Sequence, residues 1–299
     1  MKKTLIVLAL LASFQVANAQ SNVNSAAKAV ESALAASQNE KKATKVATWM
    51  KLAQTYVDAY GAPAGNVWIG ADMNALQLSM GGEKPSSVET VTLNGAQYTK
   101  QIYENKNLYF NANGQLSVIE IVKPVVENAL PKALEAYKKA YELDEKHSKD
   151  KDISAGIKTI SEKLNQEAYN AYTLGDVKKA EEYFEAAYEA AAQKPYAQID
   201  TNSLYNAAFT SWSTENFSKA KTMFDKCLGY GYYGDGGEVF AKLSDCVSHI
   251  DTTAAGKTAA KEYLEQGFQK FPTSESIVFG LINYCLLYTS PSPRDGATS

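Results

Sequence analysis

The sequence contains few of the residues on which metal sites and most catalytic sites depend. Its 299 residues include two histidines, His147 and His249, and three cysteines. No His-x3-His pair and no Cys-x2-Cys pair occurs, so no metal-ligand cluster is indicated. Asp and Glu are plentiful, but runs such as Glu181-Glu182 follow the solvated face of a helix. We therefore expect two surface histidines, no metal, no cofactor and no catalytic residue in a protein that is not an enzyme.

Clusters of basic residues are also missing. Arg294 is the only arginine, beside 29 lysines. Without the first 19 and the last 15 residues, 27 basic and 32 acidic residues remain, a net charge of about −5. Nucleic-acid binding depends on Lys and Arg side chains that neutralise phosphates. The charge balance therefore argues against nucleic acid as a partner.

A long apolar run stands at the N-terminus. Lys2 and Lys3 precede the apolar stretch from Thr4 to Phe14, and small residues up to Ala19 offer a cleavage site before Gln20. This pattern is typical of a secretory signal peptide over residues 1–19, with a buried N-terminal helix as the alternative. No other stretch approaches the ~20 apolar residues of a spanning helix. We expect a periplasmic or secreted protein, exported by a Gram-negative bacterium, without a membrane span in the mature chain.

The last fifteen residues differ in character from the rest. Residues 285–299 resemble a translated sequencing adapter, and the sole arginine, Arg294, lies among them. Two prolines within three residues break the helical pattern that leads up to Tyr284. We interpret this tail as an artefact, with a natural disordered tail as the alternative. The natural protein is then expected to continue past Tyr284, and the array described below to be truncated.

A small-large-small spacing recurs four times along the chain, and its last three occurrences are forty residues apart. Residues at positions i, i+4 and i+7 share one helical face, so small residues there permit close helix approach. Ala133, Tyr137 and Ala140 show the pattern first. It returns at Ala180, Phe184 and Ala187, then at Ala220, Phe224 and Cys227, and finally at Ala260, Leu264 and Gly267.

These motifs resemble the helix-turn-helix unit of the tetratricopeptide repeat family. Trp49-x2-Leu52-Ala53-x2-Tyr56 is similar to the signature of the first helix of the unit, and Ala260-x3-Leu264-x2-Gly267-x4-Pro272 to that of the second. The period of 40 exceeds the usual one of about 34 residues, so longer loops are expected at 193–199 and 229–237. The resemblance implies an all-α, tetratricopeptide-like solenoid of stacked helical hairpins, since one hairpin cannot bury its apolar face alone.

A segment of different periodicity interrupts the helices. β-Branched and aromatic residues alternate between Val88 and Lys123, with turns at Asn94-Gly95 and Asn113-Gly114. Such Asn-Gly pairs are strong hairpin signals, so we expect a small antiparallel sheet of three or four strands. Pro124 would end the last strand, and Val125 would begin the next helix. The expected domains are N-terminal helices with a first hairpin at 20–85, a β insert at 86–123 and the main array at 124–284.

Three further motifs have simple structural interpretations. Gly256-Lys257-Thr258 lacks the preceding glycine of a phosphate-binding loop and is interpreted as a helix start. Asp251-Thr252-Thr253 resembles a short O-glycosylation motif of exported bacterial proteins, but a helix cap is the simpler interpretation. Cys227 and Cys246 could form one disulfide in an oxidising compartment, although Cys227 falls where a small buried residue is expected. Whether the two are bonded stays open at this point.

The resemblance also implies where a partner would bind. In this family, the first helices of successive units line the concave face. Carried over, this register places Asn165, Tyr169 and Tyr172 on that face from one unit, and Asn202, Tyr205, Phe209 and Trp212 from the next. Aromatic rings with polar tips suit the binding of a peptide. The alternative is that these rings pack between neighbouring helices.

The sequence thus predicts a non-enzymatic periplasmic scaffold that binds a partner peptide or protein through the concave face. An alternative of a different class is an envelope glycan or small-molecule carrier that uses the β insert and the tyrosine-rich loop at 229–237. A third possibility, an enzyme, would need a catalytic domain beyond Tyr284.

Overall fold

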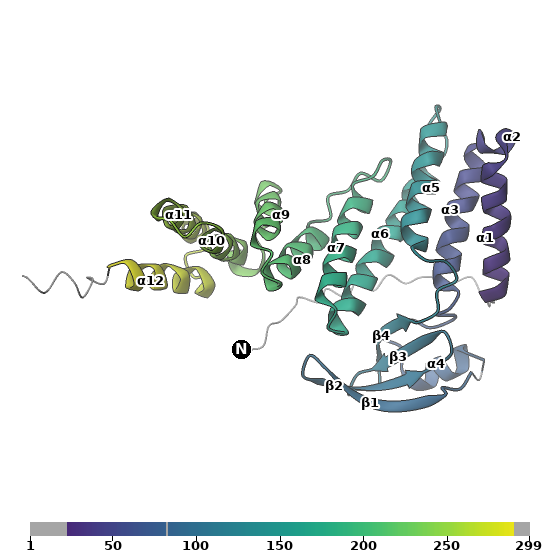
Figure 1. The fold of residues 1–299 in the computed structure, drawn as a ribbon, viewed down its shortest axis with the longest axis horizontal. Helices are drawn as coiled ribbons and strands as arrows, with labels where there is room; N and C mark the ends of the chain where they lie inside the picture. The colour runs from purple at the N-terminus through teal and green to yellow at the C-terminus, as the bar shows by residue number, and fades with distance from the viewer. Residues whose placement is uncertain (1–22, 82, 290–299) are drawn as a thin grey trace, which may run out of the picture.

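The computed structural model describes residues 23–81 and 83–289, with only the backbone described for 286–289. The predicted signal peptide, its cleavage site at Ala19 and Gln20, and residues 290–299 of the tail lie outside the described residues. Most of the described chain is helical, and a four-stranded sheet follows the first helices (Figure 1). The helices are α1 (Val23–Gln38), α2 (Glu40–Ala43), α3 (Val46–Gly61), α4 (Met73–Ser79), α5 (Ala129–Leu143), α6 (Asp150–Thr173), α7 (Val177–Ala191), α8 (Thr201–Ser213), α9 (Phe217–Gly229), α10 (Glu238–Ile250), α11 (Ala254–Lys270) and α12 (Glu275–Thr289).

The residues with small-large-small spacing form the buried faces of their helices. Ala180, Phe184 and Ala187 of α7 are completely buried, and so are the corresponding residues of α9. The sets in α5 and α11 are nearly as deeply buried. The prediction that these residues lie at helix–helix contacts is therefore confirmed. Because Ala and Gly occupy little volume, the helix axes approach closely and the large residue fills the space between them.

Helices pack mainly against their neighbours in the sequence. α6 packs on α7, α8 on α9 and α10 on α11, and α7 with α8 and α9 with α10 join one pair to the next. Connections of three residues, such as the one between Thr173 and Val177, make α6–α7 and α8–α9 helical hairpins. In Figure 1 the helix axes turn gradually from vertical at α1 and α3 to nearly horizontal at α12. The chain thus forms an elongated row of packed helices.

In the sequence, the sheet lies between two helices that pack on each other. α3 packs on α1 and, across the whole insert, on α5. Leu52 and Ala53 of α3 share one core with Ala133 and Tyr137 of α5. α1 and α3 also pack on each other within 20–85, and α5 joins this pair as a third helix after the sheet. The sequence concealed this because α3 and α5 are separated by more than sixty residues.

Four strands form the predicted antiparallel sheet: β1 (Ser87–Leu93), β2 (Ala96–Ile102), β3 (Lys106–Phe110) and β4 (Leu116–Ile121), in this order across the sheet. Asn94 and Gly95 both have positive φ, as the type I′ turn of a two-residue hairpin requires. The side chains of Leu108, Phe110 and Leu116 pack with Leu76 of α4 in a small separate core.

The helix after the sheet begins later than predicted. α5 starts at Ala129 and not at Val125, because Asn128 adopts a left-handed conformation with φ 54°. A helix cannot continue through such a residue. The residues between Pro124 and Asn128 therefore form an irregular connection.

Two asparagines attach the sheet to α6. Asn94 at the β1–β2 turn donates from Nδ2 to the carbonyl oxygens of Tyr172 and Thr173, at 3.0 and 3.3 Å. Asn170 donates from Nδ2 to the carbonyl oxygen of Ile119 in β4, at 3.1 Å. The last carbonyls of a helix lack partners within the regular helix, and Asn94 supplies a donor to two of them. The insert is therefore fixed to the end of α6.

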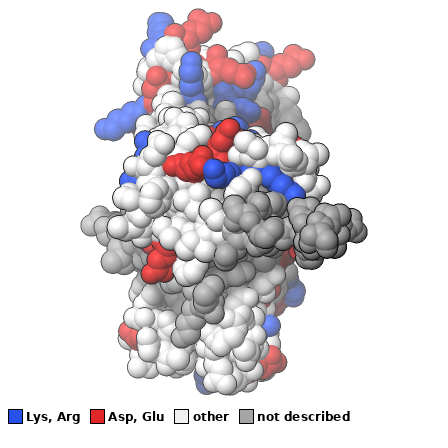
Figure 2. Space-filling view, turned by 90° about the vertical axis from the view of Figure 1, so that its left-hand side faces the viewer, with Lys and Arg blue, Asp and Glu red and all other residues white. Residues whose placement is uncertain are grey.

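The C-terminal helix runs further than predicted. α12 continues through Cys285 to Thr289, since no helix-breaking residue precedes Pro291. Phe279 and Ile282 of α12 are 63% and 47% exposed. Figure 2 looks at this end of the molecule and shows charged side chains gathered in its upper part and sparse in its lower part. No helix within the described ranges is long and apolar enough to cross a membrane.

Candidate functional site

The predicted binding residues lie on two helices that face each other. Asn165, Tyr169 and Tyr172 belong to α6, and Asn202, Tyr205, Phe209 and Trp212 to α8. Asn202 is exposed and the other six are half-buried. We call Tyr169, Tyr172, Tyr205, Phe209 and Trp212 the aromatic strip.

Hydrogen bonds between side chains join α6 to α8 along this strip. Asn165 Nδ2 donates to Ser203 Oγ at 2.6 Å, and Ser203 Oγ donates to Asp200 Oδ2 at 2.6 Å. Asn206 Nδ2 donates to the hydroxyl oxygen of Tyr169 at 3.0 Å. The ring of Tyr169 meets Phe184 edge to face, with centroids 5.1 Å apart. The structure thus uses Asn165 and the tip of Tyr169 to hold neighbouring helices together.

A second set of contacts joins α8 to α10 in the same way. The Tyr205 hydroxyl donates to Glu238 Oε1, and Trp212 Nε1 donates to Asp245 Oδ2 at 2.6 Å. Burial, and then the Glu238 carboxylate, raise the pKa of Tyr205, so its hydroxyl remains a proton donor. The polar tips of Tyr205 and Trp212 therefore join neighbouring helices, as the alternative interpretation expected. Parts of both rings keep contact with solvent.

Aromatic rings and charges are combined at the α8–α10 end of the strip. The centroids of Phe209 and Trp212 lie 5.8 Å apart. Lys242 Nζ lies 3.2 Å from the Trp212 centroid and 5.2 Å from that of Phe209. An ammonium over an aromatic face gains cation–π energy. This part of the surface can therefore hold a cationic group between aromatic rings and the carboxylates of α10.

Sequence reasoning missed the residues that α10 contributes. Glu238 and Asp245 each follow their aromatic partner by 33 residues, close to the usual tetratricopeptide spacing. A search at that spacing for polar partners of Tyr205 and Trp212 would have found them.

A half-buried polar cluster between α3 and α6 was also missed. Tyr60 of α3 donates its hydroxyl to Glu167 Oε1 of α6 at 2.5 Å. Lys163 Nζ lies 5.2 Å from the Tyr60 ring centroid. Burial raises the pKa of Glu167 and lowers the pKa of Lys163, because both charged forms lose hydration. The cluster joins the N-terminal helices to the rest of the row.

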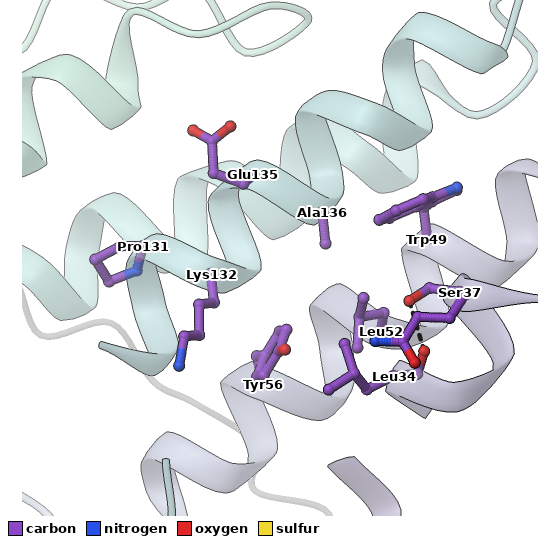
Figure 3. A pocket seen from close by; sticks show the side chains of 10 residues that line it. Leu34, Ser37, Trp49, Leu52, Tyr56, Pro131, Lys132, Glu135 and Ala136 are labelled. Atoms are coloured by element: carbon purple, nitrogen blue, oxygen red, sulfur yellow. Dashed lines mark hydrogen bonds between the residues drawn. The ribbon is translucent and has the colours of Figure 1, made fainter. Parts of the chain in front are cut away.

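An open groove lies where α1, α3 and α5 meet, at the N-terminal end of the helix row and away from the aromatic strip (Figure 3). Its volume is about 470 Å³. Leu52 and Tyr56 of α3 and Leu34 of α1 give it a mainly apolar surface, and Lys132 and Glu135 stand on its α5 side (Figure 3). Sequence reasoning gave no sign of this groove, because residues about a hundred positions apart form it.

The motifs set aside from the sequence have structural roles. Gly256-Lys257-Thr258 lies in the first turns of α11, and Thr253 Oγ1 caps this helix by accepting from Gly256 N at 3.3 Å. Both histidine side chains are more than half exposed, which confirms that they are surface residues. Within the described part of the chain, no group of three or more His, Cys, Asp or Glu could hold a metal ion.

The tyrosine-rich loop is only partly exposed. Tyr230 is 46% exposed, but the Tyr232 ring packs 5.5 Å from Tyr205 and the Tyr233 ring stacks 5.8 Å from Phe240. Two of the three loop tyrosines thus contribute to helix packing.

Cys227 and Cys246 are buried and not bonded to each other. Cys227 of α9 and Cys246 of α10 are free thiols in the same core. Burial raises the pKa of each to about 12, which keeps them protonated and unreactive.

No protein-family model matches this chain, and no curated protein is detectably similar to it in sequence. Its likeness to tetratricopeptide repeats stays a prediction from motifs and from the packing of the helices.

Proposed function

We propose that this chain is a non-enzymatic, periplasmic or secreted scaffold of tetratricopeptide type. It binds an extended peptide or a helix of a partner protein across α6, α8 and α10. The observation that carries the proposal is the aromatic strip, whose rings are fixed in place while part of each remains in contact with solvent. Hydrogen bonds to Tyr205 and Trp212 hold the rings in one orientation, so little conformational entropy is lost on binding.

The chemistry of the strip also favours a partner with a basic side chain. Lys242 already places an ammonium over Trp212 and Phe209. An Arg or Lys of a bound peptide can compete for the same aromatic faces and for the carboxylate of Asp245. We therefore expect bound peptides to combine apolar residues with at least one cation.

Photo-crosslinking tests the location of the site. Asn202 is exposed beside the strip on α8, whereas Glu182 is exposed on α7, which contributes none of the predicted binding residues. A photoreactive residue at Asn202 should crosslink one defined partner peptide, identified by mass spectrometry, and the same residue at Glu182 should not. Equal crosslinking at both positions would contradict the assignment.

Two further variants separate the rings from their polar tips. Phe209→Ala removes an aromatic face that has no hydroxyl or N–H to lose, and should weaken peptide binding at least tenfold. Tyr205→Phe keeps the ring and removes only the hydroxyl that anchors it to Glu238, so binding should weaken less than in Phe209→Ala. Circular dichroism would verify that both variants keep their helices.

The alternative function, glycan or small-molecule binding, has less support. It relies on the loop at 229–237, where Tyr232 and Tyr233 pack against other rings. Deleting residues 86–123 would separate the two functions, because the aromatic strip lies on α6 and α8 and not on the insert.

A further inference from the structure

The insert has one sheet edge that no other element covers. β1 is the first strand of the order β1-β2-β3-β4, and it pairs only with β2 among the described strands. In Figure 1 it runs along the bottom of the molecule, on the side of the sheet away from the helices. An open edge offers backbone N–H and C=O groups to another strand.

The hairpin turn determines which backbone groups face outward. In a two-residue hairpin the residues that flank the turn, here Leu93 and Ala96, exchange both backbone hydrogen bonds. Inward and outward residues then alternate along the strand. Val88, Thr90 and Thr92 therefore direct three N–H and three C=O groups to the free edge. All three residues are exposed, Val88 to 57%.

The opposite edge of the same sheet is protected. β4 packs against α6, and Asn170 binds the carbonyl oxygen of Ile119 in β4 at 3.1 Å. The β3–β4 pair also contains a register shift at Tyr109 and Phe110. β1 has fewer protective features: it contains no Lys and no Pro, Glu89 is its one charged residue, and its register with β2 is unbroken over seven residues. The two edges thus differ in their readiness to pair.

We propose that β1 pairs antiparallel with β1 of a second copy of this chain, about a two-fold axis at Thr90. The eight strands of the two copies form one continuous sheet. The strand is self-complementary in this register, because Val88 lies opposite Thr92 and Glu89 opposite Val91 of the other copy. β-Branched residues face each other, and the two Glu89 carboxylates do not. Glu89 already lies opposite Lys100 of β2 in the same copy.

The charge distribution is compatible with this pairing. Glu89 is the only charged residue of β1, and Lys100 the only one of β2. The lower part of the molecule in Figure 2, where Figure 1 places the sheet, carries few charged side chains. Little repulsion therefore opposes the approach of two sheets. The proposal is independent of peptide binding at α6, α8 and α10.

Sedimentation velocity over a range of concentrations tests the pairing. We expect a reversible dimer of the protein, which Thr90→Lys weakens at least tenfold because two ammonium groups would lie directly opposite each other. Gln97→Lys adds the same charge on the exposed part of β2, away from the free edge, and should leave dimerisation unchanged. A protein that is monomeric at every concentration would overturn the proposal, and so would equal weakening by both variants.

A disulfide test measures the register directly. Residues opposite each other in a hydrogen-bonded pair have Cα atoms about 5.5 Å apart, within disulfide range. With the exposed Cys285 replaced by Ser, Thr90→Cys should give covalent dimers on mild oxidation, and Gln97→Cys should give far fewer. Equal or absent crosslinking in the two variants would exclude the β1–β1 register about Thr90. Unchanged circular dichroism would show that the variants are folded.

Discussion

Replacing Gly156 with alanine should destabilise the protein, although alanine is the better helix former. Gly156 lies in α6, and a Cβ atom at this position would come within 2.2 Å of Cζ of Tyr137. Tyr137 is the large residue of the small-large-small set in α5 and is 4% exposed. Its ring packs in the core that α3, α5 and α6 share, so a shift of the ring would disturb that packing.

The two opposing effects can be compared in magnitude. Helix propensity favours alanine over glycine by roughly 1 kcal/mol. Inserting a methyl group into a packed core costs about 1–3 kcal/mol. Carbon atoms in contact normally lie about 3.5–4 Å apart, so a separation of 2.2 Å places the cost at the upper end. The expected net loss of unfolding free energy is therefore about 2 kcal/mol.

Urea denaturation followed by circular dichroism measures this change, and Gly61 provides the matched control. Gly61 ends α3, and a Cβ atom there would meet nothing within 4 Å. Gly61→Ala should be neutral or slightly stabilising. Tyr137→Leu should recover part of the loss in the Gly156→Ala variant, because it makes room for the methyl group. Equal stabilisation by both alanine substitutions would refute the packing of α6 on α5 described above.

Three other outcomes follow from the same structure. With a thiol reagent at pH 8, the folded protein should react only at Cys285, and all three cysteines should react in denaturant. Burial raises the pKa of Cys227 and Cys246 from 9.0 to about 12, so the unfolding free energy should fall as the pH rises from 9 to 12. Burial raises the pKa of Glu167, so its carboxyl ionises at a lower pH in the unfolded chain than in the folded one. The wild type should therefore lose stability relative to Glu167→Gln as the pH rises above about 4.5. Parallel pH profiles of the two proteins in urea denaturation would contradict this. Asn94→Gly keeps the turn but removes the bonds to α6, and should lower the protection of the β1–β2 amides in hydrogen exchange at a cost of about 1 kcal/mol.

Local patterns in the sequence predicted the elements and their buried faces. The spacing of Ala180, Phe184 and Ala187 identified one face of a helix, since 3.6 residues per turn place these positions together. Asn94-Gly95 identified a hairpin because few other pairs adopt positive φ at two successive positions. Both signals are short-range, so one sequence contains them completely. Export, partner binding and tetratricopeptide kinship stay predictions.

The tertiary structure alone decided how distant segments meet. Helix α5 pairs with α3 across an insert of more than sixty residues, which no local periodicity could reveal. The tips of Tyr205 and Trp212 bind carboxylates of α10, and Tyr60 binds Glu167, because helix packing brings together side chains that are 33 to 107 residues apart. Likewise, both edges of the sheet consist of β-branched strands, yet only β1 remains open, because α6 packs against β4. Sequence periodicity sets which face of an element is apolar, but the identity of the neighbour that covers this face depends on the path of the whole chain.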